Sequence, residues 1–281
     1  MPHNRVSAWA GLHYFVSRRG LGANTDSQSV VTWPEGNGFL VDRLRERVSD
    51  QVSENSLAYR VENTEDGVQV DVLNTTDKSR IRYSAQHAIY CGPRFTAERV
   101  IEKYVLEPAM KTKLEYMPWL IANITLSKPP ISHGAPLSWD NVSYYSPSLG
   151  YIVANHQDLK QNRSEAVITY YLPLDSDSAD SERKKWRDKS YSELSRVVAQ
   201  DLEKMHPGIT PTIRQLDVWL WGHGMISPGI GHLWSEGRKS LARAWGHIEF
   251  AHSDMSGISI FEEAQYQGVE AAKRVLKRRA T

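Results

Sequence analysis

The stretch that decides the fold runs from residue 246 to residue 264 and reads GHIEFAHSDMSGISIFEEA. Its apolar start, residues 248–251, predicts a short strand, and Ser259-x-x-Glu262 predicts the start of a helix. The turn between them is polar and contains Asp254. A helix N-terminus offers unpaired N–H groups and a partial positive charge. The pattern therefore suits a bound pyrophosphate, or it is an ordinary packing unit.

Polar and small residues flank this predicted helix start. An aspartate just before the helix, Asp254, has the chemistry to accept a hydrogen bond from a sugar hydroxyl. Further along, four small residues recur at helical spacing, and they predict close packing of the helix against a sheet: Ala264, Gly268, Ala271 and Ala272.

Working outward, strand-like patterns fill the middle of the chain and helical patterns fill both ends. Strands are predicted at 30–33, 68–72, 88–90, 120–126, 151–154, 166–172 and 213–221. Helices are predicted at 9–16, 39–48, 95–105 and 191–202, in addition to the C-terminal one. This order predicts a mixed fold of the α/β or α+β class.

Local signals mark several boundaries between these elements. Asn37 is a plausible N-cap, and Ser190-x-x-Glu193 is a capping-box pattern. The loop-like stretches are 20–29 and the Asp- and Ser-rich segment 174–182, which we expect to be exposed.

Composition excludes several classes of protein. The 281 residues are 40% hydrophobic and 24% charged, with a formal net charge of +1, so no basic field attracts nucleic acid. The basic end of the chain, residues 273–279, suits a helix C-terminus. A single cysteine, Cys91, rules out an intramolecular disulfide and a cysteine-based metal cluster. No apolar run approaches the roughly 20 residues that span a bilayer, and no signal peptide is visible, which fits a cytoplasmic protein.

The residues 219–224 form a second candidate site. They predict a strand that runs into a glycine-rich turn, with Trp221 and the imidazole of His223 at its mouth. His223 is a candidate proton donor or acceptor near neutral pH, or a structural hydrogen-bonding residue. Several aromatic residues nearby would line a pocket or pack in the core: Trp119, Trp139, Tyr144, Tyr145, Tyr151 and Trp219.

The C-terminal stretch resembles the flavin motif of the amine oxidase and phytoene desaturase-like superfamily of oxidoreductases. In that motif a strand ending in Phe-Ala leads into an acidic turn and a helix with Glu, Gly and Ala-Ala positions, which Phe250, Ala251, Asp254, Glu262, Gly268, Ala271 and Ala272 fill. The pair His252-Ser253 departs from the small residues that relatives often have. The resemblance implies FAD as the cofactor.

Three upstream segments resemble the same family in the same order. Residues 32–41 are similar to the loop before a cofactor-domain helix. The segment from Leu57 to Val61 is similar to the strand that touches adenine. Residues 84–93 are similar to a strand that ends in proline beneath the cofactor. The resemblance implies cofactor contacts at Gly36, Gly38, Leu57, Pro93, Asp254, Ser256, Gly257 and Phe261.

The resemblance also implies a division of the chain and a reaction. Residues 1–105 would be part of an FAD-binding Rossmann-like domain, 106–240 a sheet-and-helix substrate domain, and 241–281 the C-terminal FAD-binding strand–turn–helix. The implied activity is flavin-dependent removal of a hydride from a small apolar or aromatic substrate. Many relatives that oxidise amines have a lysine on the strand matching 119–123, where this chain has none, so desaturation stays open beside amine oxidation.

One expected element of the family is missing from the sequence. The G-x-G-x-x-G turn that holds a dinucleotide is absent, because Gly20-x-Gly22 and Gly36-x-Gly38 lack the third glycine. We therefore expect one of three situations. The chain is a fragment or truncated form, it pairs with a separate nucleotide-binding chain, or it is a non-catalytic remnant or partner subunit that no longer binds FAD alone.

Overall fold

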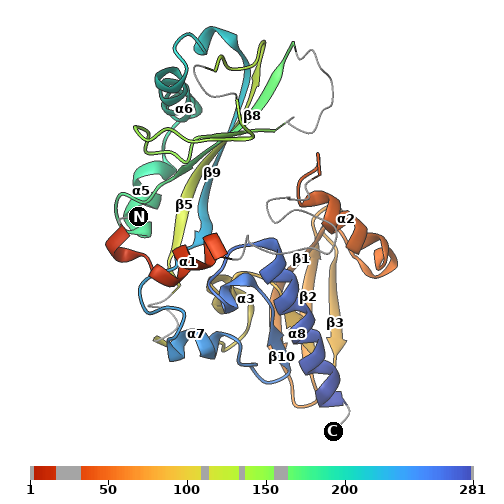
Figure 1. The fold of residues 1–281 in the computed structure, drawn as a ribbon. Helices are drawn as coiled ribbons and strands as arrows, with labels where there is room; N and C mark the ends of the chain where they lie inside the picture. Colours follow the sequence, from red (N-terminus) through yellow and green to blue (C-terminus); the bar gives the residue numbers. More distant parts are fainter. Residues whose placement is uncertain (1–2, 17–32, 109–113, 133–136, 155–163, 280–281) are drawn as a thin grey trace, which may run out of the picture. The chain divides into compact units, whose positions relative to one another are not determined.

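The structure, a computed structural model, describes residues 3–16, 33–108, 114–132, 137–154 and 164–279 (Figure 1). The chain divides into two compact units. The first unit contains residues 1–4, 30–36 and 116–225, and the second contains residues 5–29, 37–115 and 226–281. The predicted loop 20–29 and most of the predicted strand 30–33 lie outside the described residues. The short 3₁₀ helix η1 (His3–Arg5) and helix α1 (Ala8–Val16) begin the described chain, and α1 confirms the predicted first helix.

The first unit is built on a five-stranded sheet with the order β6-β7-β8-β5-β9. The strands are β5 (Tyr116–Leu126), β6 (Asp140–Asn141), β7 (Tyr151–Val153), β8 (Ala166–Pro173) and β9 (Ile213–Ile226). β5 and β8 are antiparallel, with Leu120 opposite Leu172 and Ile124 opposite Ile168. Burial alternates along both strands, which confirms the predicted alternation of residues 120–126 and the predicted strand at 166–172.

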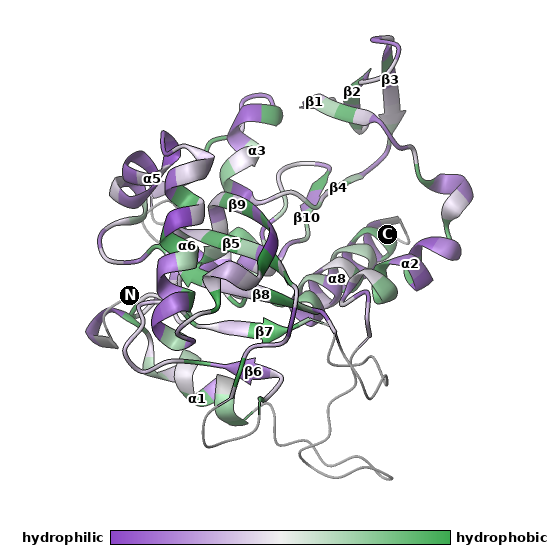
Figure 2. Cartoon of the chain, turned by 90° about the horizontal axis from the view of Figure 1, so that it is seen from above, coloured by the Kyte–Doolittle hydropathy of each residue, from purple (hydrophilic) through white to green (hydrophobic). Residues whose placement is uncertain are grey.

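Two helices pack on one face of this sheet (Figure 1). They are α5 (Ala179–Arg187) and α6 (Tyr191–Met205), and the short 3₁₀ helix η3 (Thr210–Thr212) follows. α6 starts with the predicted capping box: Ser190 accepts from the Glu193 N–H, and Glu193 accepts from the Ser190 N–H. Its apolar residues, among them Val198 and Leu202, complete the core. β5 is largely hydrophobic and α5 largely hydrophilic, as the colours of Figure 2 show.

The second unit contains two small sheets. β1 (Ser56–Asn63), β2 (Val68–Asn74) and β3 (Arg80–Ala85) form an antiparallel sheet in that order. β4 (Ala88–Tyr90) and β10 (Ile248–Phe250) pair in parallel, with Glu249 opposite Ile89. The helical elements are α2 (Gly38–Glu46), η2 (Ser49–Gln51), α3 (Arg94–Val100), α7 (Glu236–Leu241), η4 (Ser253–Met255) and α8 (Phe261–Arg279).

A separate hydrophobic core holds the second unit together. It includes Val61 and Val68 of the antiparallel sheet, Ala97 of α3 and Phe250 of β10. The predicted mixed α/β class is therefore confirmed: strands and helices share the core in each unit. Among the residues that the structure describes, no helix is both long and apolar enough to cross a membrane.

Several local predictions are wrong in detail. The segment 174–182 is not all loop, because α5 starts at Ala179 with Ser178 as its N-cap, whose hydroxyl accepts from the Ser181 N–H. Asn37 precedes α2, but its side chain makes no capping bond. α3 ends at Val100, short of residue 105.

The C-terminal helix also differs from its sequence prediction. α8 begins at Phe261, and Ser259 accepts a hydrogen bond from the Ile226 N–H at 3.2 Å. Of the four small residues expected against a sheet, Ala271 is buried, whereas Ala264 and Ala272 are exposed. Ala272 faces outward because consecutive residues lie about 100° apart around a helix, and Ala271 occupies the buried face.

Candidate functional site

The turn between β10 and α8 is organised around a buried carboxylate. Asp254 lies in η4 with 1% of its surface exposed. One carboxylate oxygen accepts from the Arg94 main-chain N–H at 2.9 Å, and the other lies 3.0 Å from Nδ1 of His252. The side chain therefore ties the turn to the first residue of α3, which follows Pro93. Its direct contact with a cofactor stays a prediction.

The second half of this turn depends on glycine. Gly257 has a φ of +74°, and a Cβ at this position would lie 2.6 Å from the ring of His232. Ser256 donates to the Ser253 carbonyl at 2.9 Å and accepts from the Ile258 N–H at 3.3 Å. The turn is thus closed by its own polar groups and has no room for a side chain at residue 257.

The first turn of α8 is negatively charged. Phe261 opens the helix, and Glu262 and Glu263 follow. Carboxylates complement the positive end of a helix dipole, and they repel a phosphate there. The start of α8 is therefore unfavourable for a bound phosphate.

The remaining predicted cofactor residues are spread over the chain. Leu57 lies on β1, at the edge of its sheet, opposite Leu73 and 53% exposed. Gly38 opens α2 in the same unit, whereas Gly36 (φ +60°) belongs to the first unit. The structure brings together Pro93, Asp254, Ser256 and Gly257 through the bond from Arg94 to Asp254.

The predicted catalytic residues lie on β9 in the first unit. The strand continues to Ile226, so the expected glycine-rich turn at residues 222–224 is wrong. The backbone is extended there because β9 pairs with β5 in the sheet. Gly224 leaves room for Trp119, since a Cβ on residue 224 would lie 2.7 Å from the Trp119 ring. Trp221 and His223 are exposed on this strand, and His223 stacks edge-on with Tyr116 at 6.1 Å between ring centroids.

His223 also lines a cavity of about 310 Å³. The other lining residues are Pro118, Arg183, Trp186, Arg187, Leu220 and Gly222. The sequence reasoning missed the α5 residues because it treated the start of α5 as loop. The available signal was the i, i+4 spacing of Arg183 and Arg187.

The other face of the five-stranded sheet is less buried. Ile121 is opposite Tyr171, and Asn123 is opposite Thr169, whose hydroxyl donates to the Asn123 side-chain oxygen at 2.8 Å. Each of these residues alternates with a buried neighbour on the helix-covered face. The face therefore offers apolar and neutral hydrogen-bonding groups.

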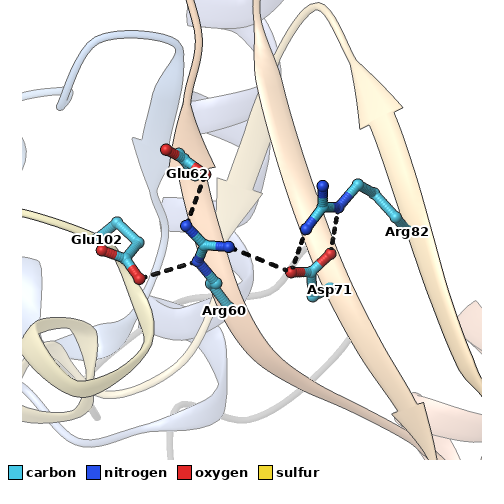
Figure 3. A network of polar contacts seen from close by, with 5 residues as sticks. All are labelled: Arg60, Glu62, Asp71, Arg82 and Glu102. Atoms are coloured by element: carbon cyan, nitrogen blue, oxygen red, sulfur yellow. Dashed lines mark hydrogen bonds and ion pairs between the residues drawn. The ribbon is translucent and has the colours of Figure 1, made fainter.

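A network of charged residues ties together the sheet of the second unit (Figure 3). Arg82 donates to both oxygens of Asp71 at 2.6 and 2.8 Å, and it holds the pKa of that carboxyl below its usual value. Arg60 binds Glu62 and Glu102 at 2.9 Å each. Arg60 also lies 3.8 Å from Asp71, so the network joins the three strands to the segment that follows α3.

Among the described residues, no group of three or more His, Cys, Asp or Glu side chains is placed to hold a metal ion.

Comparison with known proteins shows the fold. No family model matches the sequence, and no curated protein matches it. Cyclohexylamine oxidase from Brevibacterium oxydans IH-35A matches over 88% of this chain and 53% of its own, with 14% identity and a TM-score of 0.60. A putrescine oxidase redesigned in its cofactor binding matches over 86% and 53%, with 15% identity and a TM-score of 0.63.

Wild-type putrescine oxidase bound to putrescine matches similarly, with 14% identity and a TM-score of 0.58. The chain spans about half the length of these solved structures. The fold of this chain is thus similar to that of the solved cyclohexylamine and putrescine oxidases.

Proposed function

We propose that this chain forms the flavin-ring and substrate-binding portion of an FAD-dependent oxidoreductase, which removes a hydride from a small apolar or aromatic substrate. The observation that carries the proposal is the turn between β10 and α8. There a buried Asp254 and a glycine-dependent bend precede a long helix, in a chain with the amine oxidase fold. When bound, the flavin supplies the hydride-accepting ring.

The residues of the second unit would hold the cofactor. Asp254 fixes the turn, and Gly257 lets the main chain pass close to the helix start. The N–H groups that open α8, at Phe261, face a ring carbonyl, and the main chain of the edge strand at Leu57 contacts adenine. These uncharged main-chain donors are enough to orient a neutral ring, and no charged side chain is needed.

The residues of the first unit would hold the substrate. Ile121 and Tyr171 offer an apolar surface, and the Asn123–Thr169 pair offers neutral hydrogen bonds. His223 would exchange a proton with the substrate, and Trp221 would orient it. Because no lysine lies on residues 119–123, we favour hydride removal from a carbon that bears no amine.

A further polypeptide segment would supply the pyrophosphate site, either within a longer chain or in a separate nucleotide-binding chain. Two observations support this part of the proposal. The chain spans 53% of the length of its structural neighbours, and within the described residues the parallel sheet has only β4 and β10. Parallel strands usually belong to larger sheets covered on both faces.

The test compares riboflavin, FMN and FAD as ligands of the purified chain by quenching of flavin fluorescence. We expect saturable binding of riboflavin, with FMN no tighter, because the chain holds the ring and not the phosphates. Gly257→Val should abolish binding because a Cβ there meets His232 at 2.6 Å. Gly229→Val is the matched control, since nothing lies within 4 Å of its Cβ position. Absence of binding by all three flavins would favour a non-catalytic partner subunit.

A further inference from the structure

The cavity between α5 and the strands β5 and β9 has a positively charged lining. Its lining contains two guanidinium groups, Arg183 and Arg187, and the imidazole of His223. The lining residues include no carboxylate. The other walls are Pro118, Trp186, Leu220 and Gly222, which are apolar or aromatic. Such a combination favours a ligand with an anionic group and an apolar body.

The strands hold the first guanidinium in place. Arg183 Nη1 donates to the Tyr116 carbonyl on β5 at 2.8 Å and to the Gly222 carbonyl on β9 at 3.4 Å. Two main-chain acceptors on different strands orient the planar group at the edge of the cavity. The positive charge is thus a built feature of the cavity and not that of a freely moving surface side chain.

The aromatic wall is held in the same way. The Trp186 indole N–H donates to Glu182 at 2.9 Å, and the Ser176 hydroxyl donates to the other oxygen of Glu182 at 2.6 Å. Glu182 is buried, so the ring has a fixed anchor. A fixed indole presents a flat surface on which a planar ligand ring packs at little entropic cost.

The second guanidinium, that of Arg187, can exchange its present carboxylate partner for a ligand. Arg187 pairs with its neighbour Asp188 at 3.0 Å, and both side chains are 74% exposed. Exposed pairs of this kind contribute little to stability, so a ligand carboxylate that also binds Arg183 displaces Asp188 readily. Guanidinium groups bind carboxylates through two parallel N–H donors.

We propose that this cavity binds a small aromatic carboxylate. The carboxylate lies between Arg183 and Arg187, and the ring packs against Trp186 and Leu220. A volume of about 310 Å³ suits a single-ring ligand. The inference concerns binding alone, and it holds with or without the proposed flavin chemistry.

The test is calorimetric titration of the full chain, without flavin, with benzoate and with its neutral counterpart benzamide. We expect saturable binding of benzoate and at least about tenfold weaker binding of benzamide, because the amide lacks the charge that the guanidinium groups recognise. Binding that does not saturate, or equal affinity for the two ligands, would overturn the proposal.

Two variants locate the ligand. Arg187→Gln should weaken benzoate binding about tenfold through loss of one charged contact. Gly222→Val should narrow the cavity, because residue 222 lines it, and the fold should tolerate the change because a Cβ there makes only ordinary contact, at 3.8 Å, with Arg183. The matched control is Arg196→Gln on α6, an exposed arginine outside the lining. Unchanged affinity in both Arg187→Gln and Gly222→Val, with circular dichroism confirming their fold, would also overturn the proposal.

Discussion

The guanidinium of Arg274 on α8 donates to the Glu249 carboxylate on β10 at 2.9 Å and to the neighbouring Phe250 carbonyl at 3.1 Å. Glu249 is fully buried, and its other oxygen lies 2.9 Å from Arg278. Two arginines one turn apart thus fasten the C-terminal helix to the strand that precedes the proposed flavin turn.

Removal of one arginine should therefore destabilise the second unit. Arg274→Met leaves the buried carboxylate with a single partner, and we expect a loss of about 2–3 kcal/mol after allowance for the partial exposure of the arginine. Lys273→Met, which removes an exposed pair with Glu270, is the control and should cost under about 1 kcal/mol. Urea unfolding measures the stability of both variants. Equal midpoints for the two variants would show that the buried pair stabilises the protein no more than the exposed pair does.

Loss of the Asp254 carboxylate should weaken flavin binding. Asp254→Ala removes the acceptor of the Arg94 N–H and so loosens the turn. If the carboxylate also contacts the flavin as proposed, loss of that charged hydrogen bond should cost roughly 1.5–3 kcal/mol of binding, or about one to two orders of magnitude in affinity. Fluorescence titration with riboflavin measures the change. Asp66→Ala, in the exposed turn after β1, is the control. An affinity that matches wild type would exclude Asp254 from the site.

The end of α6 should make stability sensitive to acid. Glu203 accepts from the Thr210 hydroxyl and from the main-chain N–H groups of Gly208 and Thr210, and these bonds lower its pKa to about 2. Because the pKa is lower in the folded state, the stabilisation is complete above pH 4.5 and disappears as the pH falls towards about 2.

Thermal unfolding of Glu203→Gln across this range gives the check. We expect the difference between wild type and Glu203→Gln to shrink as the pH falls from 4.5 towards 2, whereas Glu65→Gln, in an exposed turn, should show no such trend. A difference that is independent of pH would mean that the carboxylate charge has no part in holding this loop.

The core of the first unit contains a polar bond whose loss should be measurable. The Tyr170 hydroxyl donates to Asp201 at 2.7 Å, and burial together with Asp201 raises the pKa of this tyrosine. Tyr170→Phe should cost about 1.5–3 kcal/mol because it removes a hydrogen-bond donor from the buried Asp201 side chain. Tyr171→Phe, on the opposite face of β8, is the comparison, and denaturant unfolding that ranks the two variants equally would contradict this role.

Local sequence patterns determined much of the secondary structure. Alternation of apolar residues predicted β2 and β5, and Ser190-x-x-Glu193 predicted the start of α6. These signals are readable because strand and helix periods and caps depend on residues a few positions apart. The resemblance of residues 246–272 to a flavin motif likewise pointed to the amine oxidase fold, which the structural neighbours show.

Tertiary structure decided the contacts of the candidate sites. Arg94 and Asp254 are 160 positions apart, and no local pattern pairs them. The local sequence at glycines 222 and 224 predicts a turn, yet β9 continues through them because the strand pairs with β5 in the sheet. The α5 cavity exists only because sheet register brings Pro118 and Leu220 beside Arg183. Sequence alone thus determined many of the elements and the likeness to the family, whereas long-range packing, which depends on strand register and burial, decided which side chains meet.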